Sequence, residues 1–105
     1  MSYKWPDKDK DEVLDYSVDW SRFLGDDTIS GVTWYINDAS DIKTAVTLAQ
    51  VVNGLQFVSG TNTNTVATAR FGLGTNNFRY TITCKITTGE GLQYERSIYL
   101  RVKEK

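Results

Sequence analysis

The 105-residue sequence contains no histidine and only one cysteine, Cys84. It therefore cannot form a disulfide within the chain, and the usual Cys/His zinc site lacks its ligands. A catalytic triad lacks its usual base. Cys84 lies between Ile82 and Ile86 on the apolar side of a predicted strand, which favours a small core residue over a nucleophile. We predict no enzymatic activity, no catalytic residue, no metal site and no cofactor.

The charged residues make up an ordinary 24% of the chain and are nearly balanced in sign. Twelve basic and 13 acidic residues give a net charge of -1, so there is no electrostatic reason to expect a nucleic acid or an anionic membrane as partner. No apolar run is long enough to span a bilayer, and the N-terminus lacks the apolar core of a signal peptide. We expect a soluble chain without a secretion signal.

Acidic residues near the N-terminus do not make a calcium loop. An EF-hand loop that starts at Asp7 would need glycine at its sixth position, where Glu12 stands, and glutamate at its twelfth, where Val18 stands. The interleaved lysines also oppose cation binding. The pattern instead indicates a solvated, charged segment.

Alternation of apolar and polar residues dominates the rest of the sequence. The clearest case covers residues 78–86 and 92–102, which predict a long β-hairpin around a turn at residues 88–91. Further strands are predicted at 14–20, 28–36, 55–58 and 65–71. The 55–58 strand should end at Ser59–Gly60, with residues 61–65 forming a loop or an exposed edge.

Residues 42–53 are ambiguous. Their apolar residues fit a helical stripe, but half of the segment is β-branched, which favours strand. Asn53–Gly54 is a typical hairpin turn. We expect strand here, with helix as the alternative.

Six to eight short strands without a secure helix predict an all-β protein, either a sandwich or a small barrel. One domain is expected from the length. The predicted core consists of Leu14, Tyr16, Val18, Trp20, Ile29, Val32, Trp34, Ile36, Tyr80, Ile82, Cys84, Ile98, Leu100 and Val102.

Residues 1–11 are predicted to form an extended, solvated arm, followed by the folded domain at 12–105. Several aromatic residues are not required by the core pattern, and exposed aromatics are typical of protein interfaces and of sugar-binding platforms. We favour protein contact. The candidate interface residues are Tyr3, Trp5, Asp7, Tyr35, Tyr94 and Tyr99.

Several stretches together resemble small virion proteins of tailed bacteriophages, of the fibre–tail adaptor or Ig-like type. The matching motifs are KDKDEVLDY (8–16), VDWS (18–21), LGDDTI (24–29), YTIT (80–83), ITT (86–88) and YERSIYLRVK (94–103). The resemblance covers residues 4–36 and 54–103. It differs at Lys10, where proline is common, and at about 38–53, which looks like an insertion.

The resemblance implies an immunoglobulin-like antiparallel β-sandwich of about seven strands, located in the virion. It also implies a non-enzymatic adaptor that links tail or neck to fibres, present in many copies and bound to other phage structural proteins. The alternatives are a capsid decoration or cement protein and a carbohydrate-binding module for host recognition. Deleting residues 1–11 is expected to weaken assembly and leave the fold intact.

Overall fold

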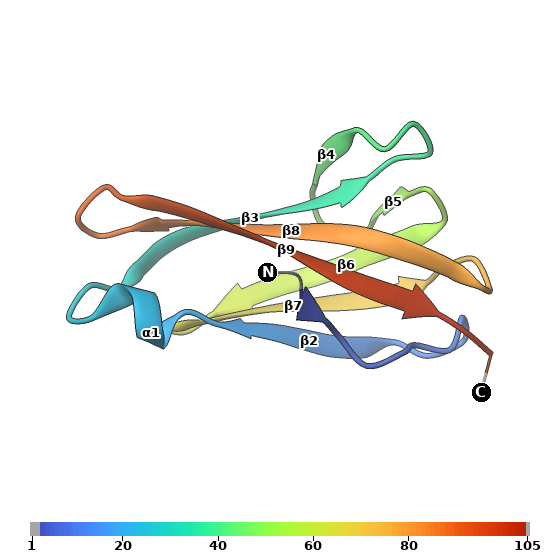
Figure 1. The fold of residues 1–105 in the computed structure, drawn as a ribbon, viewed down its shortest axis with the longest axis horizontal. Coiled ribbons are helices and arrows are strands. Elements are labelled where there is room, and N and C mark those ends of the chain that lie inside the picture. The colour runs from blue at the N-terminus through green and yellow to red at the C-terminus, as the bar shows by residue number, and fades with distance from the viewer. Residues whose placement is uncertain (1–2, 105) are drawn as a thin grey trace.

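Two β-sheets pack face to face in the computed structural model, which describes residues 3–104 (Figure 1). The five-stranded sheet has the order β1-β9-β8-β3-β4, and the four-stranded sheet has the order β2-β7-β6-β5. All strand pairs are antiparallel except β1 with β9. The elements are β1 (Tyr3–Lys4), β2 (Leu14–Asp19), α1 (Ser21–Leu24), β3 (Ile29–Asn37), β4 (Lys43–Val46), β5 (Gln50–Val52), β6 (Leu55–Asn62), β7 (Val66–Leu73), β8 (Phe78–Thr88) and β9 (Gln93–Val102).

The predicted all-β sandwich is confirmed, and the barrel alternative is wrong because the sheets remain separate. The long hairpin predicted at the C-terminal end is β8–β9, paired from Phe78↔Val102 to Thr87↔Gln93. No helix within residues 3–104 is long and apolar enough to cross a membrane.

The core lies between the sheets and is rich in aromatic rings. Phe71 of β7 is fully buried, and its ring centroid lies about 6 Å from those of Trp5, Tyr16, Trp34 and Phe57. Every predicted core residue is buried except Leu14 and Val32, which are partly buried against the core. The prediction missed Leu24, Val46, Val52, Leu55, Phe57, Ala67, Ala69, Phe71 and Ile86.

Residues 42–53 form strands, as expected, and the helical alternative is wrong. β4 extends the edge of the five-stranded sheet, and β5 extends the edge of the four-stranded sheet. Asn53 and Gly54 connect β5 to β6 with φ angles of 52° and 87°, the positive values that a tight hairpin turn requires.

β6 does not end at Ser59–Gly60 as predicted but continues to Asn62. A bulge between Phe57 and Ser59 changes the register, and β6 then resumes pairing with β7. Gly60 is needed here for close packing, since a Cβ atom would lie 2.9 Å from the Phe57 ring. The sequence pattern predicts a strand end at this glycine, but in the fold it allows the Phe57 ring to pack closely against the backbone within a continuous strand.

The N-terminal segment is not the solvated arm that the sequence predicts. Trp5 stacks on Tyr16 at 4.8 Å between ring centroids and packs against the core. Lys8 is fully buried and pairs with β9, its N–H donating to Arg101 O (3.0 Å) and its carbonyl accepting from Lys103 N–H (2.8 Å). Its Nζ donates to the carbonyls of Asp9 and Leu73. Removal of residues 1–11 should therefore destabilise the fold, contrary to the expectation from sequence.

We predict that Lys8→Met lowers the free energy of unfolding by about 1–3 kcal/mol, because buried carbonyl groups lose a charged donor. Urea denaturation measures the change. Lys10→Met is the matched control, since Lys10 is exposed, and should change stability by less than about 0.5 kcal/mol. Equal effects of both substitutions would contradict a structural role for the Lys8 ammonium.

We also predict that Cys84 is unreactive in the folded protein. The side chain is fully buried, and burial raises the pKa of its thiol to about 12. Ellman's reagent at pH 8 should detect no thiol before unfolding and one thiol after unfolding in guanidinium. If one equivalent of thiol reacted rapidly in the folded protein, the Cys84 side chain would be accessible to the reagent and the prediction would be wrong.

Candidate functional site

The exposed face of the five-stranded sheet carries two of the predicted interface residues, each covered by a cation. Lys43 Nζ lies 4.8 Å from the centre of the Tyr35 ring and 2.7 Å from Glu95 Oε1. The guanidinium of Arg79 lies 4.6 Å from the centre of the Tyr99 ring. The hydrogen bond that Lys43 donates to the Glu95 carboxylate holds the pKa of Glu95 below its usual value. Tyr35 and Tyr99 are half-buried and lie on the same face, with β8 between their strands.

A groove of about 380 Å³ opens beside α1, between β1 and β9 of one sheet and β2 of the other. Phe23, half-exposed on α1, and the buried Trp20 lie 4.9 Å from the guanidinium of Arg96. Tyr94 lies 6.3 Å from both rings. We call this feature the α1 groove, and its lining is Lys4, Trp5, Ser17, Val18, Asp19, Arg22, Phe23, Arg96 and Ile98.

The five predicted interface residues whose side chains the structure describes do not form one surface, and the Tyr3 side chain lies outside that description. Trp5 lines the α1 groove, where its indole N–H donates to Ser17 O at 3.3 Å, and Tyr94 borders the aromatic group beside that groove. Asp7 is half-buried and lies 3.6 Å from Lys4 Nζ. Tyr3 contributes its backbone to β1. Whether any of these residues contacts a partner stays a prediction.

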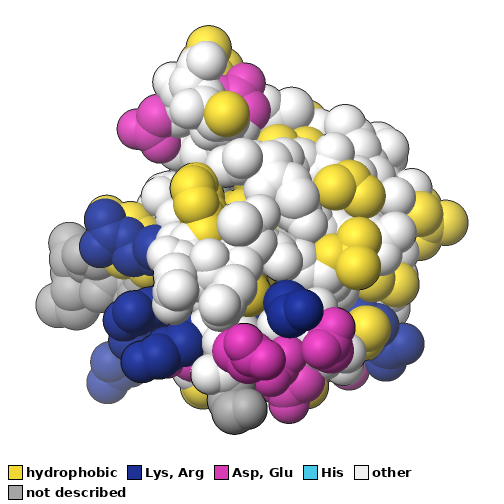
Figure 2. Space-filling view, turned by 90° about the vertical axis from the view of Figure 1, so that its right-hand side faces the viewer, with side chains coloured by type: hydrophobic (Ala, Val, Ile, Leu, Met, Phe, Trp, Pro, Cys, Tyr) yellow, Lys and Arg dark blue, Asp and Glu magenta, His cyan; other side chains and the backbone are white. Residues whose placement is uncertain are grey.

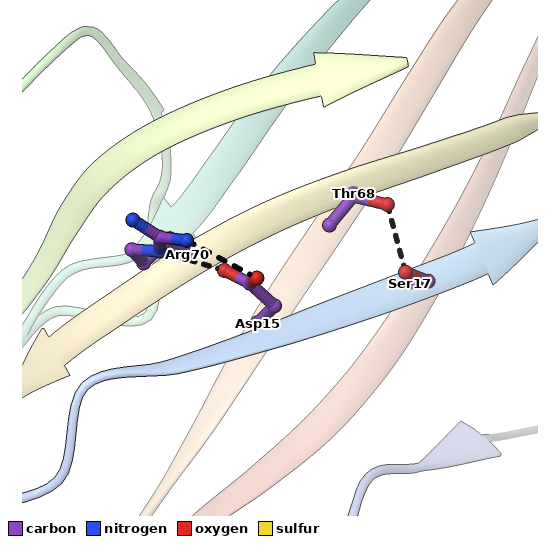
Figure 3. A network of polar contacts seen from close by, with 4 residues as sticks. All are labelled: Asp15, Ser17, Thr68 and Arg70. Carbon is purple, nitrogen blue, oxygen red and sulfur yellow. Dashed lines mark hydrogen bonds and ion pairs between the residues drawn. The ribbon is translucent and has the colours of Figure 1, made fainter. Parts of the chain in front are cut away.

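The exposed face of the four-stranded sheet carries polar contacts between β2 and β7 (Figure 3). Arg70 on β7 makes two hydrogen bonds to Asp15 on β2, at 2.8 and 3.3 Å. Two residue pairs further along, on the same face, the hydroxyls of Ser17 and Thr68 lie 2.8 Å apart. Asp15, Thr68 and Arg70, together with Ser59 and Thr61, line a shallow hollow of about 190 Å³.

A second groove lies on the opposite side of the sandwich from the α1 groove, where β4 and β5 cover only part of two strand edges. β4 pairs with β3 only at Trp34–Asn37, and β5 pairs with β6 only at Leu55–Phe57. The remaining opening has a volume of about 420 Å³. We call it the edge slot, and its lining is Val32, Thr33, Trp34, Val46, Thr47, Leu48, Phe57 and Gly60.

Figure 2 shows the end of the molecule that carries the β3–β4 turn and the end of β9. The β3–β4 turn projects from the body, basic side chains gather at the lower left of the view, and a group of acidic side chains lies near the bottom centre with a basic side chain beside it. Among residues 3–104, no three Asp, Glu or Cys side chains are grouped so that they could hold a metal ion. The features that the structure does provide are grooves, strand edges and paired charges.

The sequence pattern missed Phe23, Arg96 and Leu48, which line these grooves. Phe23 lies on a helix of only four residues, too short to show periodicity. Leu48 lies in the turn between β4 and β5, and only the structure shows that 74% of its surface is exposed. Each becomes a candidate only when the folded chain brings the neighbouring strands together.

We predict that Arg70→Gln raises the pKa of Asp15 towards its ordinary value, because the hydrogen bond from Arg70 is the main cause of its lowered pKa. A carboxyl group with a lowered pKa stabilises the fold above its unfolded-state pKa, and this contribution is lost as the pH falls through the folded-state pKa. Carboxyl NMR titration measures the shift. Asp19 is the control, since its pKa is lowered by the Ser21 backbone N–H and should not move.

Comparison with known proteins gives one family match over most of the chain. Residues 8–101 match the family model described as "Podophage GP4 fiber-tail adaptor protein gp77". No curated protein matches the chain.

Proposed function

The chain belongs to the podophage fibre–tail adaptor family gp77 and is a virion component, and we propose that it joins tail to fibre through protein–protein contacts without catalysing a reaction. The family match over residues 8–101 carries this proposal, because it includes the strands of both sheets apart from β1 and the last residue of β9. The partners are then other structural proteins of the phage particle, and the protein is present there in many copies.

The surface of the protein supports a binding role. An adaptor must contact two partners, and the α1 groove and the edge slot lie on opposite sides of the sandwich, between different pairs of edge strands. The α1 groove combines half-exposed aromatic rings with arginine and lysine, and aromatic residues and arginine are enriched at protein interfaces.

The protein has few of the side chains that catalysis commonly needs, and this supports a non-enzymatic role. The sequence has no histidine, and the single thiol is buried with a pKa raised to about 12, which prevents it from acting as a thiolate near neutral pH. Neither groove is lined by a cysteine or by more than one carboxylate.

The proposal predicts that phage particles assembled without this protein keep their tails but lack fibres. Negative-stain electron microscopy of particles from a deletion strain tests this, and supplying the wild-type chain should restore the fibres. Fibres that are present in normal number without the protein would overturn the proposal.

Immunogold labelling of complete particles distinguishes the proposal from its alternatives. Label at the junction of tail and fibre agrees with an adaptor, whereas label over the whole capsid would indicate a decoration protein. Binding of the isolated protein to a glycan array, with no label at the junction, would indicate a carbohydrate-binding module.

A further inference from the structure

The edge slot exposes strand edges that no other part of residues 3–104 covers. On β3 the open stretch is 30–33, because β4 pairs only from Trp34 onward. On β6 it is 58–62, because β5 pairs only as far as Phe57. An open strand edge presents unpaired N–H and C=O groups that can add another strand.

Both ends of the slot are closed by the protein's own chain. At one end, Ile29 N–H donates to Asn64 O at 2.9 Å and joins the start of β3 to the β6–β7 turn. At the other end, the β4–β5 turn crosses between the sheets, held by Gln50 N–H donating to Thr47 O at 3.0 Å. The opening between these ends spans the four to five residues left uncovered on each edge strand. A strand of about four residues, at about 3.3 Å per residue, has this length.

The lining determines the chemistry of a strand that could enter. The base is formed by the buried Trp34 and Phe57, with Val32 and Val46, and none of the lining residues is ionisable. A charged side chain placed here would lose its hydration without finding an opposite charge. The indole nitrogen of Trp34 lies beside Gly60, since a Cβ atom added at Gly60 would be 3.3 Å from it.

β4 and β5 show how an extended segment fits on this side of the sandwich. Val46 and Val52 point inward and are buried, whereas Ala45 and Val51 on the same strands are exposed. Leu48 lies at the rim of the slot, in the turn between β4 and β5, and 74% of its surface is exposed. A segment with small apolar side chains at every second position, facing inward, thus matches both the edges and the base.

We propose that the edge slot accepts an extended, uncharged segment of another virion protein, which adds to the open edge of β6 and continues the line of β5. This inference rests on the proposed adaptor function and names the chemistry of one of its partners. Main-chain hydrogen bonds to β6 provide the attachment, and alternate apolar side chains that contact Trp34 and Phe57 select the segment.

The test uses purified particles from the deletion strain as the binding partner and the full-length chain as the ligand. Leu48→Lys places a charge at the rim of the slot and should reduce binding to these particles at least tenfold. Leu92→Lys is the matched control, since Leu92 is 49% exposed in the β8–β9 turn, outside the slot, and it should bind like the wild type. Both positions are exposed, so both variants should fold.

Hydrogen exchange followed by mass spectrometry tests the mode of binding. Amides within residues 58–62 should exchange more slowly when the wild-type chain is bound to the particles, whereas the β8–β9 turn should be unchanged. Normal binding of Leu48→Lys, or unchanged exchange at 58–62 while the wild type binds, would overturn this inference and leave the adaptor function intact.

Two other outcomes would also overturn it. Equal loss of binding in both lysine variants would show a general effect of charge. Self-association of the isolated chain that Leu48→Lys abolishes, measured by sedimentation, would show that the slot is filled by a second copy. Failure of the wild type to bind the particles at all would contradict the adaptor function itself, and this inference with it.

Discussion

The packing of aromatic rings around Phe71 is the interaction on which the rest of the structure depends. No disulfide or metal joins the sheets within residues 3–104, so their association relies on apolar burial. Phe71 on β7 contacts rings from β2, β3 and β6 and from the N-terminal segment. This cluster sets the sheet separation, and the position of Trp5 within it brings the N-terminal segment against β9. The α1 groove and the edge slot are both consequences of that packing.

The strand edges are covered to different extents on the two sides of the sandwich. On one side, β1 and the Lys8 backbone extend the five-stranded sheet, and a buried ammonium group fixes the segment through carbonyl oxygens. On the other side, the segment from β4 to β5 covers less than half of each edge strand. An exposed edge is a risk for aggregation, and a protein that leaves one open in an apolar slot has a site suited to a partner strand.

The fold could be predicted from sequence more fully than the interaction surfaces. Alternation in β8 and β9 is local and strong, because each strand buries one face, and the pairing of Ile82 with Ile98 follows from it. Trp5 and Lys8 were misjudged because an alternating charged segment beside the only proline is typical of a solvated terminus. Their burial depends on contacts with Tyr16 and Leu73, distant in sequence. The candidate interface residues failed to group for the same reason.

The sequence by itself determined the strand periodicity, most of the core, the absence of disulfide chemistry and the resemblance to phage adaptors. These properties depend on residue type and on neighbours along the chain. Only the tertiary structure decided that residues 43–52 divide between two sheets, that Gly60 continues a strand, and that Leu48 stands beside an open edge. Those outcomes depend on which strands meet across the core. The free energy that favours one arrangement of strands comes from long-range packing, which a local sequence pattern does not contain.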